Sequence, residues 1–235
     1  MPPNGSADTD RVQVVLPATV AIPGAPPSRS EEGGGKSTGI PGFRLGRTPV
    51  TNREYAPFLE WSGGEAPPWW RHPDFCSPLA PVVGVTWSDA VAFCEWLSRI
   101  AGGRWRLPSE AEWSLAACGG LLAPRTAWGD AIPAGEIPEG PLDGPWETGR
   151  GTPNGYGLYD VGTIVHEWCT DWLQPDPPPP APRRRASRGG SWRHRVRWSS
   201  PTARSSLPPE YRYSDFGFRV LRELAPEAWP DEAGR

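Results

Sequence analysis

The sequence predicts a single α+β domain that is rich in loops and has little regular secondary structure. Three helix-start signals lie in the first half of the 235-residue chain, whereas long loops separate the strand-like segments of the second half. The 28 glycines and 32 prolines are by themselves typical of disorder, but the 14 tryptophans indicate a buried core, because disordered segments contain few aromatic residues. We therefore expect a folded domain over residues 12–224, with unstructured tails at 1–11 and 225–235.

The three helices are predicted from one repeated signal, a hydroxyl residue followed three positions later by a carboxylate. The pairs are Thr51 with Glu54, Thr86 with Asp89, and Ser109 with Glu112. In such a capping box, the two side chains satisfy backbone N–H groups that the start of the helix leaves free. Glycine pairs at 102–103 and 119–120 are expected to end the second and third helices. Pro57 lies beyond the first turn of the first helix, which should therefore be bent or short.

The expected strands are recognised from their apolar patterns between turn residues, and they lie at 12–23, 42–48, 166–172, 188–192 and 216–221. Pro17 interrupts the first of them, which forms one strand or two. In residues 166–172 (HEWCTDW), Trp168 and Trp172 share one side of the strand. Residues 174–182 contain four consecutive prolines and are expected to form a stiff polyproline connection between two strands.

Charge is unevenly distributed along the chain. The net charge is −3, but residues 183–222 hold 11 arginines against two carboxylates, a balance of 11 − 2 = +9, so the remaining residues carry −3 − 9 = −12. We expect the two parts to attract one another within the fold. The alternative is a basic surface for an anionic partner. Aromatic residues among these arginines could stack on bases, but we interpret them as walls of the core and of a groove, and expect no nucleic-acid partner.

The chain shows no signal for a membrane or for secretion. It contains no run of about 18 apolar residues, so we expect no membrane partner. The first nine residues have neither a basic flank nor an apolar stretch, and the cytoplasm is therefore the expected compartment.

The four cysteines and three histidines do not show metal-binding spacings. No C-x-x-C pair and no H-x-x-x-H pair occurs, which argues against a zinc knuckle and a histidine-centred site. Cys94 and Cys118 lie in helical patterns and are interpreted as small buried apolar residues. Ser191 and His194 are close enough for a hydrolytic set, but no G-x-S-x-G motif accompanies them.

Seven stretches, in this order and spacing, resemble the formylglycine-generating enzyme (sulfatase-modifying factor) family. They are TPVTNREYAPFLEW (48–61), PVVGVTWSDAVAFCEWL (81–97), WRLPSEAEW (105–113), PNGYGLYD (153–160), HEWCTDW (166–172), RGGSW (188–192) and FGFRV (216–220). The resemblance covers roughly residues 12–224. It implies the C-type-lectin-like α+β fold of that family, in agreement with the loop-rich composition.

The resemblance also implies an activity, the conversion of a sulfatase cysteine to formylglycine with copper(I) and oxygen. Two cysteine thiolates hold the copper, because soft ligands suit Cu(I). Carried over to this chain, their positions fall on His194 and near Ser199, and no cysteine follows Cys169. A hydroxyl cannot replace a thiolate for Cu(I), so copper is not expected here.

A calcium site is a second implied feature of the family. Glu167 keeps an acidic ligand of that site, but Ile164 stands where an asparagine is expected. The site has therefore lost one hard oxygen ligand, and calcium stays an open expectation.

Three functions remain open from the sequence. The first is a non-oxidase member with a peptide or protein in a groove. The expected groove residues are Trp168, Ser191, Trp192, His194, Arg195 and Arg204. The second is a formylglycine-generating oxidase with altered ligands, and the third is another metal-dependent enzyme that uses His166 or His194. Histidine nitrogens and carboxylates that converge near Ser191 would favour an enzyme, whereas walls of tryptophan and arginine would favour binding.

Overall fold

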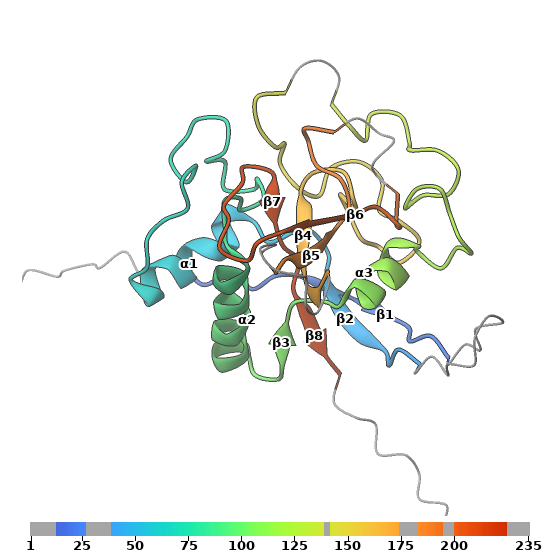
Figure 1. Ribbon diagram of the computed structural model, residues 1–235, viewed down its shortest axis with the longest axis horizontal. Helices are drawn as coiled ribbons and strands as arrows, with labels where there is room; N and C mark the ends of the chain where they lie inside the picture. Colours follow the sequence, from blue (N-terminus) through green and yellow to red (C-terminus); the bar gives the residue numbers. More distant parts are fainter. Residues whose placement is uncertain (1–12, 27–38, 139–141, 174–182, 195–199, 225–235) are drawn as a thin grey trace, which may run out of the picture.

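The computed structural model describes residues 13–26, 39–138, 142–173, 183–194 and 200–224. In this part of the chain, two four-stranded sheets combine with three helices and long loops (Figure 1). The expected tails, the polyproline connection, Arg195 and Ser199 lie outside the described residues. None of the described helices is long and apolar enough to cross a membrane.

The first sheet joins strands from both ends of the domain in the antiparallel order β1-β2-β8-β3. Its strands are β1 (Thr19–Ile22), β2 (Phe43–Gly46), β3 (Trp105–Arg106) and β8 (Leu221–Glu223). The predicted strand at 42–48 is confirmed with narrower bounds. Of the prediction at 12–23, only the part after Pro17 forms a strand, since proline has no N–H for a sheet hydrogen bond.

The second sheet has the order β6-β5-β4-β7. Its strands are β4 (His166–Trp172), β5 (Arg185–Arg188), β6 (Arg204–Leu207) and β7 (Phe216–Gly217). The central strand β4 has the bounds that the sequence predicts. It pairs antiparallel with β5 but parallel with β7, with His166 opposite Phe216. The amino-terminal ends of β4 and β7 therefore lie side by side.

The predicted strands near the carboxyl end need correction. Residues 216–221 form two strands in different sheets, β7 and β8, because the chain crosses from one sheet to the other between them. The prediction at 188–192 is wrong beyond Arg188, where β5 ends. Gly189 follows with a φ of 77°, a left-handed conformation that favours glycine and turns the chain out of the strand. Strand β6, with the sequence RSSL, was not predicted.

All three predicted capping boxes are present. They start α1 (Asn52–Ser62), α2 (Trp87–Ala101) and α3 (Glu110–Ala117). Pro57 does not end α1, which continues to Ser62. The carbonyl that loses its helical hydrogen bond to this proline belongs to Arg53, an exposed residue.

Aromatic residues link the helices to the second sheet. Tyr55 of α1 stacks on Phe93 of α2 at 5.5 Å, and Phe93 meets Phe218 edge-on at 5.4 Å. The same core cluster includes Trp168 of β4. A second cluster forms around Trp113 of α3. The buried core that the tryptophan content predicts is confirmed.

Ion pairs connect the basic segment to the acidic part of the chain. Arg188 and Arg204 both contact Glu110, and Arg212 contacts Asp89, with shortest N–O distances of 3.0, 2.5 and 2.7 Å. These contacts confirm that the opposite charges attract one another within the fold.

Candidate functional site

Two histidines and an aspartate converge where β4 and β7 begin. His166 is the first residue of β4, Asp215 directly precedes β7, and His194 lies on the segment that follows β5. The His166 backbone N–H donates to the Asp215 carbonyl at 2.9 Å, which holds the two strand ends together. One possible metal-ligand atom from each of the three side chains lies within 4.8 Å of the other two. We call His166, His194 and Asp215 the His–His–Asp cluster.

The cluster has a buried side and an exposed side. His166 and Asp215 are only 7% and 6% exposed, whereas His194 is exposed to solvent. The ring centroids of the two histidines are 5.1 Å apart, at an interplanar angle of 62°. A group that binds this cluster from solvent therefore meets His194 first.

The tautomer of His166 follows from its hydrogen bond. Its Nδ1 lies 2.7 Å from the carbonyl oxygen of Gly189, which can only accept, so Nδ1 carries the proton and Nε2 has a free lone pair. Burial lowers the pKa of His166, although the negative charge of Asp215 raises it. The ring is therefore suited to act as a neutral Nε2 ligand.

Ser191 orients the carboxylate of the cluster. Its hydroxyl is buried and donates to Asp215 Oδ2 at 2.9 Å. Its carbonyl accepts from the backbone N–H of His194 at 2.8 Å, so the same residue also positions the exposed histidine. The neighbouring Trp192 fixes this segment, because its indole N–H donates to the Ser214 carbonyl at 3.2 Å.

The structure brings together some of the predicted groove residues and separates others. Ser191, Trp192 and His194 lie together on one segment. Trp168 is fully buried in the core, where its indole N–H donates to the Val85 carbonyl, so the prediction that it lines a groove is wrong. Arg204 is held by both carboxylate oxygens of Glu110. Arg195 and Ser199 belong to the residues that the structure does not describe.

Sequence reasoning missed Asp215 and included His166 only in an alternative. No local spacing identifies them, because the parallel pairing of β4 and β7 brings the two residues together. The convergence of histidine nitrogens and a carboxylate beside Ser191 is nevertheless the geometry that favours an enzyme over a groove walled only by tryptophan and arginine.

Glu167 does not fit the implied calcium site. It is fully buried, and Trp113 Nε1 donates to its Oε2 at 2.6 Å. Arg219 donates to both carboxylate oxygens at 3.0 Å. A guanidinium therefore occupies the position of a counter-cation, and the carboxylate is fixed by contacts within the protein.

The cysteines lie outside the His–His–Asp cluster. Cys94 and Cys169 belong to two different core clusters, and burial raises the pKa of both thiols. Cys118 is partly buried at the end of α3, and its thiol pKa is also raised by burial. These thiols are protonated apolar groups and do not form a pair for Cu(I).

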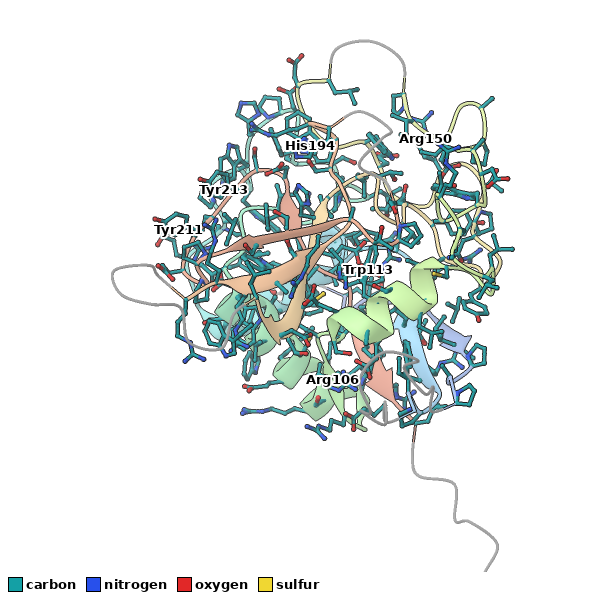
Figure 2. The ribbon with its side chains drawn as sticks, turned by 45° about the vertical axis from the view of Figure 1, so that its right-hand side comes forward. Arg106, Trp113, Arg150, His194, Tyr211 and Tyr213 are labelled. Atoms are coloured by element: carbon teal, nitrogen blue, oxygen red, sulfur yellow. The ribbon has the colours of Figure 1, made fainter. Side chains whose placement is uncertain are left out.

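An aromatic surface borders the cluster. His166 contacts Phe216 at 4.8 Å between ring centroids, Phe216 contacts Tyr213 at 6.1 Å, and Tyr213 stacks on Tyr211 at 6.4 Å. Both tyrosines are 45% exposed. Figure 2 shows Tyr211 and Tyr213 at the left edge of the molecule, with His194 above and to the right of them. We call His194, Trp192, Tyr211 and Tyr213 the aromatic surface.

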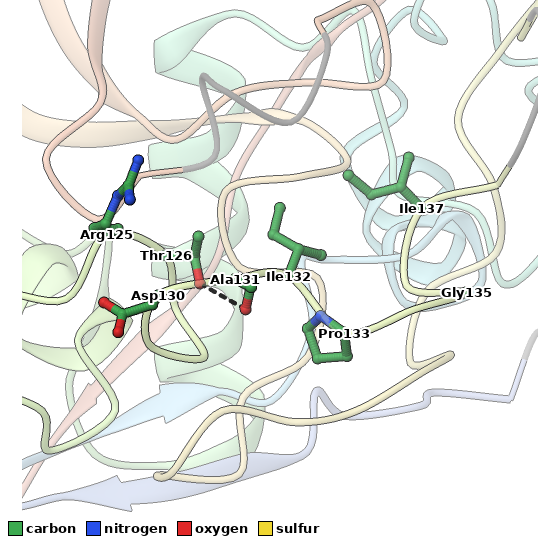
Figure 3. A pocket seen from close by; sticks show the side chains of 8 residues that line it. All are labelled: Arg125, Thr126, Asp130, Ala131, Ile132, Pro133, Gly135 and Ile137. Carbon is green, nitrogen blue, oxygen red and sulfur yellow. Dashed lines mark hydrogen bonds between the residues drawn. The ribbon is translucent and has the colours of Figure 1, made fainter.

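A cavity of about 550 Å³ lies elsewhere, in the loop between α3 and β4 (Figure 3). Its lining residues come from residues 125–137. The Thr126 hydroxyl closes this loop by donating to the Ala131 carbonyl at 3.3 Å. Among the described lining residues, Arg125 and Asp130 are the charged ones, and they do not form a cluster of titratable groups comparable to the His–His–Asp cluster.

Comparison with known proteins identifies relatives of this chain. Residues 5–224 match the family described as the sulfatase-modifying factor enzyme 1-like domain. A formylglycine-generating enzyme of Streptomyces coelicolor is 35% identical over 193 residues, which cover 66% of this chain and 58% of that protein. The mouse protein named inactive C-alpha-formylglycine-generating enzyme 2 is 28% identical over 274 residues, which cover 86% of this chain and 85% of that protein.

A solved structure confirms the fold. The crystal structure of CarF superposes with a TM-score of 0.70 and 22% identity, covering 90% of this chain and 100% of that chain. This likeness supports the predicted C-type-lectin-like α+β fold, and at this identity it carries no functional conclusion. The chain spans only 58% of the length of the Streptomyces relative, so activity does not transfer with the fold.

Proposed function

This chain belongs to the family of sulfatase-modifying factor enzyme 1-like domains, and we propose that it is a non-oxidase member that binds a peptide or protein. The observation that carries the proposal is His194, which stands where the resemblance implies a copper-binding cysteine. With Ser199 near the second position, the chain offers an imidazole and a hydroxyl in place of two soft thiolates. The buried cysteines of the core clusters do not compensate for this loss.

The aromatic surface supports a binding role. Tyrosine and tryptophan are enriched at protein interfaces because they present a large apolar area together with a polar group. Tyr211 and Tyr213 are stacked and half exposed, and the guanidinium of Arg193 lies 4.9 Å from the Trp192 ring. This arrangement suits a peptide with apolar side chains flanked by an acidic residue. The mouse relative, whose name describes an inactive enzyme, supports a member of this family without the oxidase activity.

Two measurements on the full chain test the proposal. With Cu(I) and a C-x-P-x-R peptide, oxygen uptake should not exceed the blank. A peptide selected from a random display library should bind, and Tyr211→Ala and Tyr213→Ala should each weaken it about tenfold, consistent with the loss of an aromatic contact. Leu122→Ala is the matched control, because Leu122 is 99% exposed and lies outside the aromatic surface. Stoichiometric copper in the purified protein together with oxygen consumption would overturn the proposal.

The His–His–Asp cluster favours a second function, that of a metal-dependent enzyme unlike the copper oxidase. Two imidazoles and a carboxylate around a solvent-facing position form a ligand set found in catalytic zinc and non-haem iron sites. An enzyme of this kind requires the metal, which can be tested without knowledge of a substrate.

A further inference from the structure

The donor atoms of the His–His–Asp cluster are close enough to share one ion. Donors on metal bonds of about 2.1 Å lie at most about 4.2 Å apart. Here they lie within 4.8 Å of one another before any ion is bound. His166 and Asp215 are buried, whereas His194 is exposed and has room to rotate toward an ion that the other two ligands hold.

The contacts around the cluster are those that a metal site needs. A ligating histidine usually donates its other ring N–H to a carbonyl or carboxylate, and a ligating carboxylate is itself hydrogen-bonded. The Gly189 carbonyl accepts from His166 Nδ1 at 2.7 Å, and the Ser191 hydroxyl donates to Asp215 Oδ2 at 2.9 Å. Two of the three ligands are therefore already oriented by buried partners.

The chemistry of the donors selects the class of ion. Calcium and magnesium prefer all-oxygen sites, and Cu(I) prefers thiolates. Two imidazole nitrogens with one carboxylate oxygen suit divalent first-row transition metals such as Zn²⁺ and Fe²⁺.

We infer that His166, His194 and Asp215 bind one divalent first-row transition-metal ion through two imidazole nitrogens and a carboxylate. Three protein ligands leave at least one coordination position open, on the solvent side where His194 lies. Gly189 and Ser191 act as positioning residues for this site. The inference does not depend on the proposed peptide ligand, and it names the metal site on which the second proposed function, that of a metal-dependent enzyme, rests.

The third histidine provides a matched control. His72 lies 3.5 Å from the carboxylate of Asp74, but both side chains are about half exposed, at 51% and 48%. Among the residues that the structure describes, no third ligand joins this pair. It should not bind the ion.

The test uses the full chain, stripped of metal by chelator dialysis and titrated with Co²⁺, whose visible absorption reports coordination. We expect one equivalent to bind with the intense bands of a low-coordinate site. His194→Ala and Asp215→Asn should each weaken binding at least a hundredfold, and His72→Ala should leave it unchanged. Circular dichroism of each variant shows whether it is folded, and His194→Ala alters an exposed residue.

Three results would overturn the inference. They are the absence of Co²⁺ binding, bands that persist in both His194→Ala and Asp215→Asn, and bands that His72→Ala removes. Competition by Zn²⁺ and anaerobic loading with Fe²⁺ then separate the two metals, and either one satisfies the inference. The same metal-free protein is used to measure peptide binding, so failure of the metal site and failure of the binding function are seen separately.

Discussion

Adjacent residues of β4 lie in two opposite environments. Glu167 is part of a closed group in which its carboxylate is shared by Arg219 and Trp113, all of them buried. His166, one position earlier, is part of the His–His–Asp cluster, whose third member His194 is exposed. Successive side chains of a strand point to opposite faces, so a single strand supplies both groups. The burial of polar side chains therefore does not by itself indicate a functional site. Of these two groups, the His–His–Asp cluster has an exposed member, His194, through which a ligand can reach it from solvent.

The first prediction concerns the buried ion pair of Glu167 and Arg219, whose loss should change stability the most. Glu167→Ala should lower the free energy of unfolding by about 3–5 kcal/mol, because the guanidinium of Arg219 is left buried without its counter-ion. Urea unfolding measures the loss. Glu95→Ala, at an exposed carboxylate of α2, is the control and should change stability by less than about 0.5 kcal/mol. A loss below about 1 kcal/mol for Glu167→Ala would show that the buried Arg219 does not depend on Glu167 as its counter-ion.

The second prediction tests the His–His–Asp cluster by adding a metal ion. Zn²⁺ at a free concentration a hundredfold above its Kd should raise the free energy of unfolding by about 2.7 kcal/mol, because the ion binds the native state. His194→Ala should remove this gain and change the metal-free stability by less than about 0.5 kcal/mol. Thermal unfolding with and without Zn²⁺ measures both values. An equal gain in the variant would place the ion elsewhere.

A third prediction uses the carboxylate of Asp160, near the closed group. Burial raises the pKa of Asp160 to about 6 from its usual value of 3.8, although the charge of Arg219 lowers it. The native state then holds a proton that the unfolded state releases, so this residue makes the protein less stable as the pH rises from about 4 to about 6. Asp160→Asn keeps an acceptor for the N–H of Gly149 and tolerates the positive φ of 57°.

The measurement is the difference in unfolding free energy between Asp160→Asn and the wild type at several pH values. The difference should shift in favour of the variant by about 2 kcal/mol between pH 4 and pH 7. A flat difference would contradict the raised pKa.

The fourth prediction, with the least effect on stability, tests whether Ser191 orients the Asp215 carboxylate or binds the metal ion itself. Ser191→Ala removes the hydrogen bond to Asp215 and should cost about 1 kcal/mol of stability. It should weaken Co²⁺ binding about 10- to 100-fold, less than the loss of a ligand. Ser98→Ala removes the hydroxyl bonds of Ser98 to the Cys94 carbonyl and to the Trp105 backbone, outside the His–His–Asp cluster, and should leave the Co²⁺ affinity unchanged. Equal losses for Ser191→Ala and His194→Ala would make Ser191 a ligand.

Local chemistry made much of the fold predictable. Thr51, Thr86 and Ser109 form capping boxes with carboxylates only three residues away, and each helix starts as predicted. The strand at 166–172 was predicted from alternation with the same bounds. The split of 216–221 between two sheets was not predictable, because the apolar pattern is the same whether the partner strand is β4 or β2.

The candidate site was less predictable from local sequence patterns than the helices and strands. Residue types and motif order need no coordinates, so the amino-acid sequence is enough to establish the absence of cysteine after Cys169, the imidazole at position 194 and the family. The placement of His166 and Asp215 beside His194, and the burial of Trp168 and Glu167, depend on how the chain folds. The parallel pairing of β4 with β7 brings residues together that are distant in the chain, and it leaves no recognisable spacing in the sequence.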